Sequence, residues 1–199
     1  KGGAEKNTYL LSKSFDYKNF DINLILWNTS SIKIKGVKNQ VIKKKNLNNS
    51  FITVLLLLMK NNPDYIFSSL NHMNIFLGII KIFSGIKSNL ILRESNLLSL
   101  KLKDELKENK FKINLRKFFT SIIYNCSQIV ICPSKEIQND LRNNFLVNKN
   151  KLKFIPNLFE KKIINRNQNK INDNKTLISL GRLEKQKDYI FMIKAFHRS

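Results

Sequence analysis

The apolar positions of this chain alternate between short continuous runs and longer stretches with helical spacing. The short runs have the length of buried strands and end at turn residues. The predicted strands cover residues 22–27, 65–67, 90–92, 129–132, 152–155 and 177–180. Because helical stretches separate them, the strands are expected to pair in parallel through right-handed crossovers. The pattern therefore predicts a doubly wound parallel α/β sheet.

Apolar residues three or four positions apart predict the helices between these strands. The predicted helices cover residues 4–15, 48–60, 72–84, 111–126 and 137–145, with a last one close to the end of the chain. Ser134 stands where an N-cap belongs, and the helix over 72–84 is expected to end near Gly85. Most of the 14 phenylalanines fall on apolar helix faces, which predicts that they belong to the core.

One polar stretch divides the chain. Residues 160–175 are rich in Asn and Lys and show no periodicity, so we interpret them as a linker. Residues 1–159 are then a first Rossmann-like domain, and residues 176–199 are the beginning of a second. Because the chain starts at Lys1 and stops inside a helical pattern, we expect it to be a fragment.

The charge is strongly positive. Lys and Arg number 36 against 14 Asp and Glu, which gives a formal net charge of +22. Such an excess favours an anionic partner: nucleic acid, an acidic membrane surface or a phosphorylated substrate. The abundance of Lys, Asn and Ile is also what an AT-rich genome would impose on any protein, so compositional drift is an equally good explanation.

The cysteines and the apolar runs indicate in which cellular compartment the protein is expected. Cys126 and Cys132 have neither the spacing nor the histidine neighbours of a zinc site or a disulfide framework, which fits a reducing cytoplasm. The longest apolar run, Val54 to Met59, is far shorter than the roughly 20 residues that cross a bilayer. We expect a cytoplasmic protein, soluble or bound to one side of the membrane.

Candidate chemistry follows the strand at 177–180. Gly181 lets the backbone approach a ligand, and Arg182 and Lys187 add cations where an open α/β sheet binds its ligands. A phosphate group is the expected ligand. A turn with solvated charges is the ordinary alternative for such a pattern.

Further candidates lie in the first domain. Gly2 and Gly3 open the first helix, where bare N–H groups and the helix dipole favour an anion or a sugar hydroxyl. Arg93 and Glu94 come directly after a strand and could bind substrate or form a simple ion pair. His72 also follows a strand, and a helix-capping or packing role is its alternative.

The order of four segments resembles glycosyltransferase family 4, the retaining GT-B enzymes. In chain order these are GGAE, VICPSKEIQNDL, KFIPN and LISLGRLEKQKDYIFMIKAF. The resemblance covers nearly the whole chain and is most specific in the last segment. It implies transfer of a sugar from a nucleotide sugar, with UDP as the expected nucleotide, to a lipid-linked oligosaccharide or a surface polysaccharide such as lipopolysaccharide.

The resemblance also implies roles for the candidate residues. Arg182 and Lys187 match the pair that holds the donor diphosphate and stabilises it as the leaving group, and no metal is needed. Gly2 and Gly3 match the glycine-rich loop that faces donor and acceptor. The segment around Arg93 and Glu94 matches the acceptor side.

The chain departs from the family pattern at two places. The family's pair of glutamates that grips ribose and sugar is absent, and the central strand that precedes the glycine-rich loop is missing. We therefore expect a gap or an altered pairing in the sheet, and a fragment that is inactive alone.

Residues 98–117 carry a second possible role. Leu98, Leu102 and Leu106 recur every four residues beside a lysine stripe, as in helices that lie on an acidic membrane. An ordinary amphipathic surface helix explains the pattern equally well. Peripheral binding at the inner face of the cytoplasmic membrane would suit a lipid-linked acceptor.

Two other functions remain open. A nucleic-acid-binding α/β protein would use the charge of +22, but such a protein should interleave exposed aromatic and basic residues on one surface. A catalytically dead α/β scaffold domain is the other alternative. Nucleic acid is not the expected partner.

Overall fold

The computed structural model describes residues 3–27, 37–42, 50–107, 109–158, 178–179, 181 and 188–197. The chain divides into two units, residues 1–160 and 161–199. The second unit contains helix α7 (Tyr189–His197). The strand predicted over 177–180 and the linker predicted over 160–175 fall largely or wholly outside the described residues.

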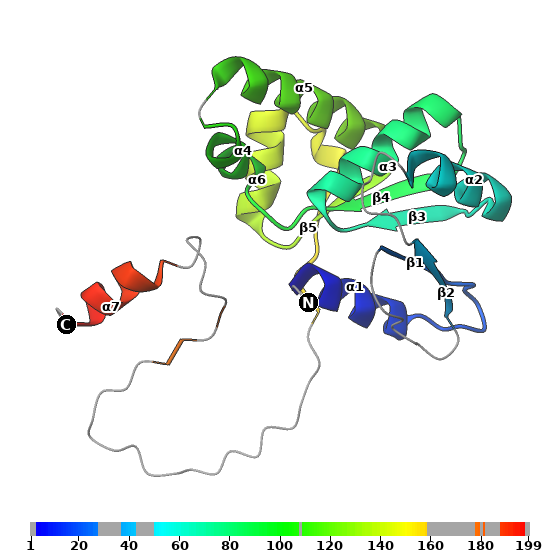
Figure 1. Cartoon of the computed structure of the whole chain (residues 1–199), viewed down its shortest axis with the longest axis horizontal. Coiled ribbons are helices and arrows are strands. Elements are labelled where there is room, and N and C mark those ends of the chain that lie inside the picture. The colour runs from blue at the N-terminus through cyan, green and yellow to red at the C-terminus, as the bar shows by residue number, and fades with distance from the viewer. Residues whose placement is uncertain are drawn as a thin grey trace, which may run out of the picture. The chain divides into compact units, whose positions relative to one another are not determined.

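The first unit is an α/β structure (Figure 1). Its strands are β1 (Asn23–Trp27), β2 (Lys38–Ile42), β3 (Tyr65–Ser68), β4 (Asn89–Arg93), β5 (Ile129–Cys132) and β6 (Leu152–Phe154). Its helices are α1 (Gly3–Ser14), α2 (Phe51–Asn61), α3 (Asn71–Ser84), α4 (Leu98–Glu105), α5 (Lys110–Cys126) and α6 (Lys135–Phe145), with a 3₁₀ turn, η2 (Lys149–Lys151).

All strand pairs are parallel, as the sequence predicts. One sheet has the order β3-β4-β5-β6, and β1 and β2 form a sheet of their own. Among the described residues, no strand joins the two sheets. The fold is consistent with a Rossmann-like part of a GT-B enzyme. β2 was not among the predicted strands.

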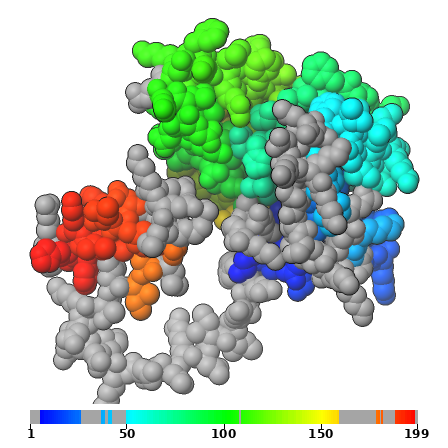
Figure 2. Space-filling view, viewed as in Figure 1, coloured from blue at the N-terminus to red at the C-terminus, as the bar shows by residue number. Residues whose placement is uncertain are grey.

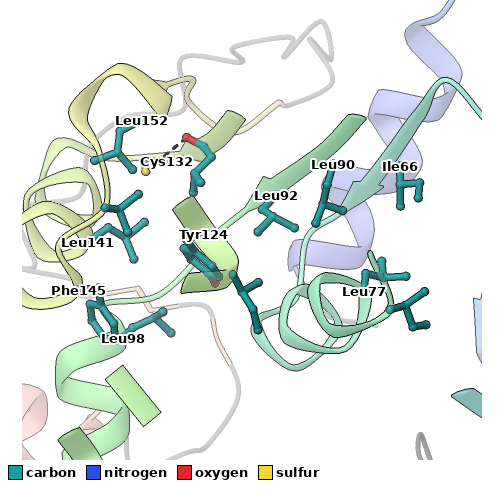
Figure 3. Close-up of a cluster of buried hydrophobic side chains, with 14 of the residues drawn as sticks. Ile66, Leu77, Leu90, Leu92, Leu98, Tyr124, Cys132, Leu141, Phe145 and Leu152 are labelled. Atoms are coloured by element: carbon teal, nitrogen blue, oxygen red, sulfur yellow. Dashed lines mark hydrogen bonds between the residues drawn. The ribbon is translucent and has the colours of Figure 1, made fainter. Parts of the chain in front are cut away.

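The core lies between the four-stranded sheet and its helices. Figure 1 shows α2, α3, α5 and α6 on one side of this sheet and α1 on the other. Alternate strand residues such as Leu90, Leu92 and Val130 face the helices and are almost fully buried. Figure 3 shows Leu90 and Leu92 between side chains that include Leu77 and Tyr124. Such burial is the main stabilising contribution to the unit.

The helix ends follow local rules. Ser134 caps α6 as predicted, because its hydroxyl oxygen accepts a hydrogen bond from the Ile137 amide at 3.3 Å. Gly85 ends α3 in the left-handed conformation with φ of 66°, which a glycine adopts without strain. The predicted limits of these two helices are therefore confirmed.

Helix α5 is oriented differently from the prediction. The stripe of Phe111, Leu115, Phe118 and Ile122 faces solvent, and the helix packs on the core through Ile113, Thr120, Ile123 and Tyr124. The helix has apolar residues on two faces, and spacing alone cannot tell which one is buried. The prediction that most phenylalanines belong to the core is thus wrong, because further phenylalanines outside this helix are exposed as well: Phe15, Phe20, Phe83, Phe154, Phe191 and Phe196.

Residues 98–117 do not form one helix. They contribute α4 and the first part of α5. Leu98 and Leu102 are buried in the core with 1% and 4% exposure, so these side chains are not available to a lipid surface. Membrane binding by the rest of residues 98–117 stays a prediction.

Candidate active site

The carboxyl ends of β3, β4, β5 and β6 meet at one edge of the sheet, because the strands are parallel. Open α/β sheets bind their ligands at this edge. The end of β4 and the segments that follow β3, β4 and β6 bring polar residues there: Ser69, Asn71, Arg93, Glu94, Ser95, Asn96 and Asn157. This edge is the candidate site.

Arg93 links two of these loops. The residue is 7% exposed, and its guanidinium donates hydrogen bonds to the Ser95 hydroxyl at 3.1 Å and to the side-chain oxygen of Asn157. Asn157 follows β6, so the guanidinium joins the loop after β4 to the loop after β6. Burial lowers the pKa of Arg93, and the Glu94 charge opposes this effect. An arginine stays protonated at neutral pH after such a shift, so the site holds a fixed cation.

Glu94 is enclosed beneath the same loop, with 1% exposure. One carboxylate oxygen accepts hydrogen bonds from the Ser95 amide at 2.9 Å and the Asn96 amide at 3.2 Å. The other accepts from the Tyr124 hydroxyl at 2.7 Å and the Asn71 amide at 3.3 Å. Burial raises the pKa of Glu94, and these four hydrogen bonds partly counteract the shift. The carboxylate thus holds the turn after β4 in one conformation.

Tyr124 and Asn74 extend the network into the core. Tyr124 is fully buried, and its oxygen accepts hydrogen bonds from Asn71 at 3.1 Å and Asn74 at 3.2 Å. Asn74 also donates to the Arg93 main-chain carbonyl at 3.1 Å. Burial and the Glu94 charge raise the pKa of Tyr124 well above its usual value, so its hydroxyl keeps its proton and donates it to the carboxylate. The network joins α3, α5 and the end of β4.

Helix α1 approaches the same edge from the other side of the sheet. The Thr8 and Ser69 hydroxyls are hydrogen bonded at 2.9 Å, and Ser69 follows β3. The Asn7 side chain accepts from the Leu158 amide at 2.8 Å, beyond β6. Gly3 begins α1, four residues before Asn7.

His72 is an exposed residue in the first turn of α3, which starts at the same edge. Partial burial lowers the pKa of His72, and the positive charge of Lys101 lowers it further. The imidazole is therefore mostly neutral near pH 7 and keeps one nitrogen free to accept a proton or a hydrogen bond.

Arg93 and Glu94 lie together at this edge, and His72 follows Asn71, whose side chain donates a hydrogen bond to Glu94. Arg93 and Glu94 use different partners, so their side chains do not form the simple ion pair considered above. Gly181 is an exposed residue of the second unit. Gly2, Arg182 and Lys187 lie outside the described residues, and their roles stay predictions.

Sequence reasoning missed several members of the site. Asn157 belongs to the KFIPN segment, which the sequence relates to a family but to no particular contact, and Tyr124 lies on the side of α5 away from its phenylalanine stripe. Asn71 and Asn74 are polar residues three positions apart on a mostly apolar helix, and this pattern could have identified them from the sequence.

Cysteine and metal chemistry gain no support from the described parts of the chain. Cys126 and Cys132 are both free thiols. Burial and the Glu94 charge raise the pKa of Cys132 to about 12, so this thiol is not a nucleophile near neutral pH. The described residues contain no group of three His, Cys, Asp or Glu side chains that could hold a metal ion.

The fold and this edge define a parallel α/β protein with a cationic polar site at the carboxyl ends of its strands. No family model matches the chain. The chain is 26% identical over 213 residues to the N-acetylgalactosamine-N,N'-diacetylbacillosaminyl-diphospho-undecaprenol 4-alpha-N-acetylgalactosaminyltransferase of Campylobacter jejuni. The match covers 99% of this chain and 56% of that enzyme, so the chain spans about half of its relative's length. This distant similarity supports a glycosyltransferase family.

Proposed function

We propose that this chain is the acceptor-side domain, followed by the beginning of the donor-binding domain, of a retaining glycosyltransferase. The enzyme would move a sugar from a nucleotide sugar, with UDP as the expected nucleotide, to a lipid-linked or surface glycan. The observation that carries the proposal is the fixed Arg93 cation at the carboxyl edge of the sheet, held by Ser95 and Asn157. The similarity to a transferase that is named for a diphospho-undecaprenol-linked substrate supports a lipid-linked acceptor.

The first unit would position the acceptor. Arg93 has guanidinium N–H groups beyond the two hydrogen bonds that fix it, and these suit an anionic or hydroxyl group of the acceptor. Neutral His72 would accept a hydrogen bond from a sugar hydroxyl. Glu94 would act through the turn that it holds rather than by contact with the acceptor, because its oxygens already accept four hydrogen bonds.

The donor side is proposed from the sequence. Arg182 and Lys187, next to Gly181 in the sequence, would bind the diphosphate of the donor, and Gly2 and Gly3 would form the glycine-rich loop. As the bond from the anomeric carbon to the diphosphate breaks, negative charge grows on the leaving oxygen, and the two cations stabilise it. The acceptor hydroxyl forms the new bond on the same face and passes its proton to the leaving diphosphate. No metal is expected in this scheme.

Sugar transfer by the full-length protein that carries this sequence tests the proposal. The protein would be incubated with UDP-sugars and a polyprenyl-diphosphate-linked acceptor, and the anomeric configuration of the product would be read by NMR. The proposal predicts transfer with retention. Inverted product, or no transfer from any nucleotide sugar, would contradict it.

A substitution at Arg93 separates acceptor binding from donor binding. Arg93→Lys keeps the charge but loses the planar fork, so KM for the acceptor should rise by about tenfold while the affinity for the donor stays unchanged. Arg142→Lys, at an exposed position of α6, is the matched control and should leave both values unchanged. A loss of donor affinity in Arg93→Lys would show that Arg93 contributes to donor binding, which contradicts its proposed role in acceptor binding.

The place of action is also a proposal. We propose a cytoplasmic protein that works at the inner face of the cytoplasmic membrane, where a lipid-linked acceptor would be found. Within the described residues, every helix is too short or too polar to span a bilayer.

A further inference from the structure

Both hydrogen-bond partners of the Arg93 guanidinium are connected to helix α1. The first partner is Ser95, which accepts a hydrogen bond from Nη1 of the guanidinium. The Ser95 hydroxyl in turn donates to the Ser69 main-chain carbonyl at 3.4 Å, and the Ser69 hydroxyl is hydrogen bonded to Thr8 of α1 at 2.9 Å. We call Thr8, Ser69 and Ser95 the serine arm. It leads from α1 to one end of the guanidinium.

The second partner is Asn157, and its connection to α1 is made by the residue next to Thr8. The Asn157 side-chain oxygen accepts from Nη2 of Arg93. The amide of the following residue, Leu158, donates to the Asn7 side-chain oxygen at 2.8 Å. Both Asn157 and Leu158 are exposed, so hydrogen bonds rather than burial hold this segment in place. We call Asn7, Asn157 and Leu158 the asparagine arm.

The two arms end on different nitrogens of one planar group, and together they fix the direction in which the guanidinium points. A planar fork of donors binds an anion or a hydroxyl well only when its orientation matches the ligand. Small errors in the placement of such a group lower the efficiency of a reaction strongly. Because the two arms start at adjacent residues of α1, a shift of this helix changes both of them at once.

The position of α1 itself depends on polar contacts. Among the α1 side chains that the structure describes, those of residues 6–14, only Ser12 is buried. Helix α3 on the other side of the sheet buries four residues. Figure 2 shows atoms of α1, in dark blue, at the surface of the unit. With so little apolar burial, the directional hydrogen bonds of Asn7 and Thr8 contribute strongly to the placement of the helix.

A simple attachment of α1 to the sheet is the alternative role for these two hydrogen bonds. It does not explain why both of them reach partners of the same guanidinium. We propose that Asn7 and Thr8 are positioning residues for Arg93: through the two arms they set the orientation in which its guanidinium meets the acceptor. The inference rests on the proposed function, in which Arg93 binds the acceptor. Asn7 and Thr8 act through Asn157 and Ser95 and do not touch the acceptor themselves.

Kinetics of the full-length protein with UDP-sugars and a polyprenyl-diphosphate-linked acceptor test the proposal. Asn7→Leu and Thr8→Val remove the hydrogen-bonding groups at nearly constant volume. Each should raise KM for the acceptor about fivefold and leave kcat and KM for the donor nearly unchanged. Thr8→Ser keeps the hydroxyl and should keep the acceptor KM of the unmodified protein. Asn143→Leu, at an exposed position of α6, is the matched control. Intact transfer with an unchanged acceptor KM in both variants would overturn the positioning role and leave the proposed function standing.

A double-mutant cycle tests whether the asparagine arm acts through the guanidinium. In the Arg93→Lys background, Asn7→Leu should raise the acceptor KM no further, because the planar fork that the arm orients is gone. Additive increases would mean that Asn7 acts by another route, and they would overturn the proposal.

Chemical modification gives a readout that needs no sugar transfer. Phenylglyoxal reacts with accessible guanidinium groups, and Arg93 is 7% exposed. Peptide mapping by mass spectrometry would measure its rate of modification in the full-length protein. Asn7→Leu and Thr8→Val should raise this rate about fivefold, whereas Thr8→Ser should not. An unchanged rate in both variants would overturn the positioning role. The predicted rates without any sugar transfer would overturn the proposed function alone.

Discussion

At the scale of single residues, the candidate site depends on one buried carboxylate. Burying an ion is costly unless its hydrogen-bonding capacity is satisfied. Glu94 meets this condition through two backbone amides, Tyr124 and Asn71. The hydrogen bonds offset only part of the desolvation cost, and for this reason the pKa of Glu94 is raised. The benefit is a fixed turn that places the Arg93 guanidinium beside Asn157.

Removal of the carboxylate should destabilise the unit. Glu94→Ala leaves the Tyr124 hydroxyl and two backbone amides without their acceptor, so the free energy of unfolding should fall by about 3 kcal/mol. Glu94→Gln keeps one acceptor oxygen and should cost about 1 to 2 kcal/mol. Urea unfolding followed by circular dichroism measures both values. A fall below about 0.5 kcal/mol for Glu94→Ala would show that the network does not form.

The same residue should make stability depend on pH. A raised pKa means that the folded protein binds the Glu94 proton more tightly than the unfolded chain does. The resulting stabilisation is fully present below the ordinary pKa of 4.5 and is lost as the pH rises through the higher folded pKa. Relative to Glu94→Gln, the unmodified chain should therefore lose stability as the pH rises above 4.5. Glu136, whose pKa is lowered by the Ser134 hydroxyl, should give the opposite sign.

At the scale of elements, the position of α5 depends on its close contact with α3. The contact is made at Gly78, where an added Cβ would lie 2.2 Å from the Ile123 Cγ2 atom. That distance leaves no room for any side chain. The pair sets how near the two helices approach, and so where Asn74 and Tyr124 meet.

Substitution of this glycine should therefore destabilise the unit, although alanine is the better helix former. Gly78→Ala should lower the free energy of unfolding by about 1 to 3 kcal/mol because of the clash with Ile123. Ile123→Ala removes the clashing methyl group. The double variant should therefore be less destabilised than the sum of the two single variants. Additive losses would mean that the helices are not in close contact.

Most elements of the first unit could be predicted from sequence because strong local signals mark their ends. Pro63 and Asp64 separate α2 from β3, Gly85 ends α3, and Ser134 begins α6. The buried face of α5 could not be predicted, since both of its faces are apolar. For the same reason Tyr124 was not recognised as part of the site.

The members of the site were only partly predictable. His72, Arg93 and Glu94 could be singled out because each follows a strand, and parallel strands bring such residues to one edge. Asn157 is 64 residues from Arg93, and a contact over that distance depends on the order of the strands. Spacing in the sequence does not carry that information.

At the scale of the whole molecule, the charge of +22 and the two units suggest complementary tasks. In our proposal the first unit positions an acceptor, and the second supplies the cations that hold a nucleotide diphosphate.

Calorimetric titration of the full-length protein with UDP-sugars tests the central claim most directly. The account predicts measurable binding that weakens by about tenfold or more in Arg182→Ala and in Lys187→Ala, because each variant removes a charge-assisted hydrogen bond to the diphosphate. Lys194→Ala, which removes an exposed cation of α7, is the matched control and should bind as the unmodified protein does. Unchanged affinity in the Arg182 and Lys187 variants would contradict the account.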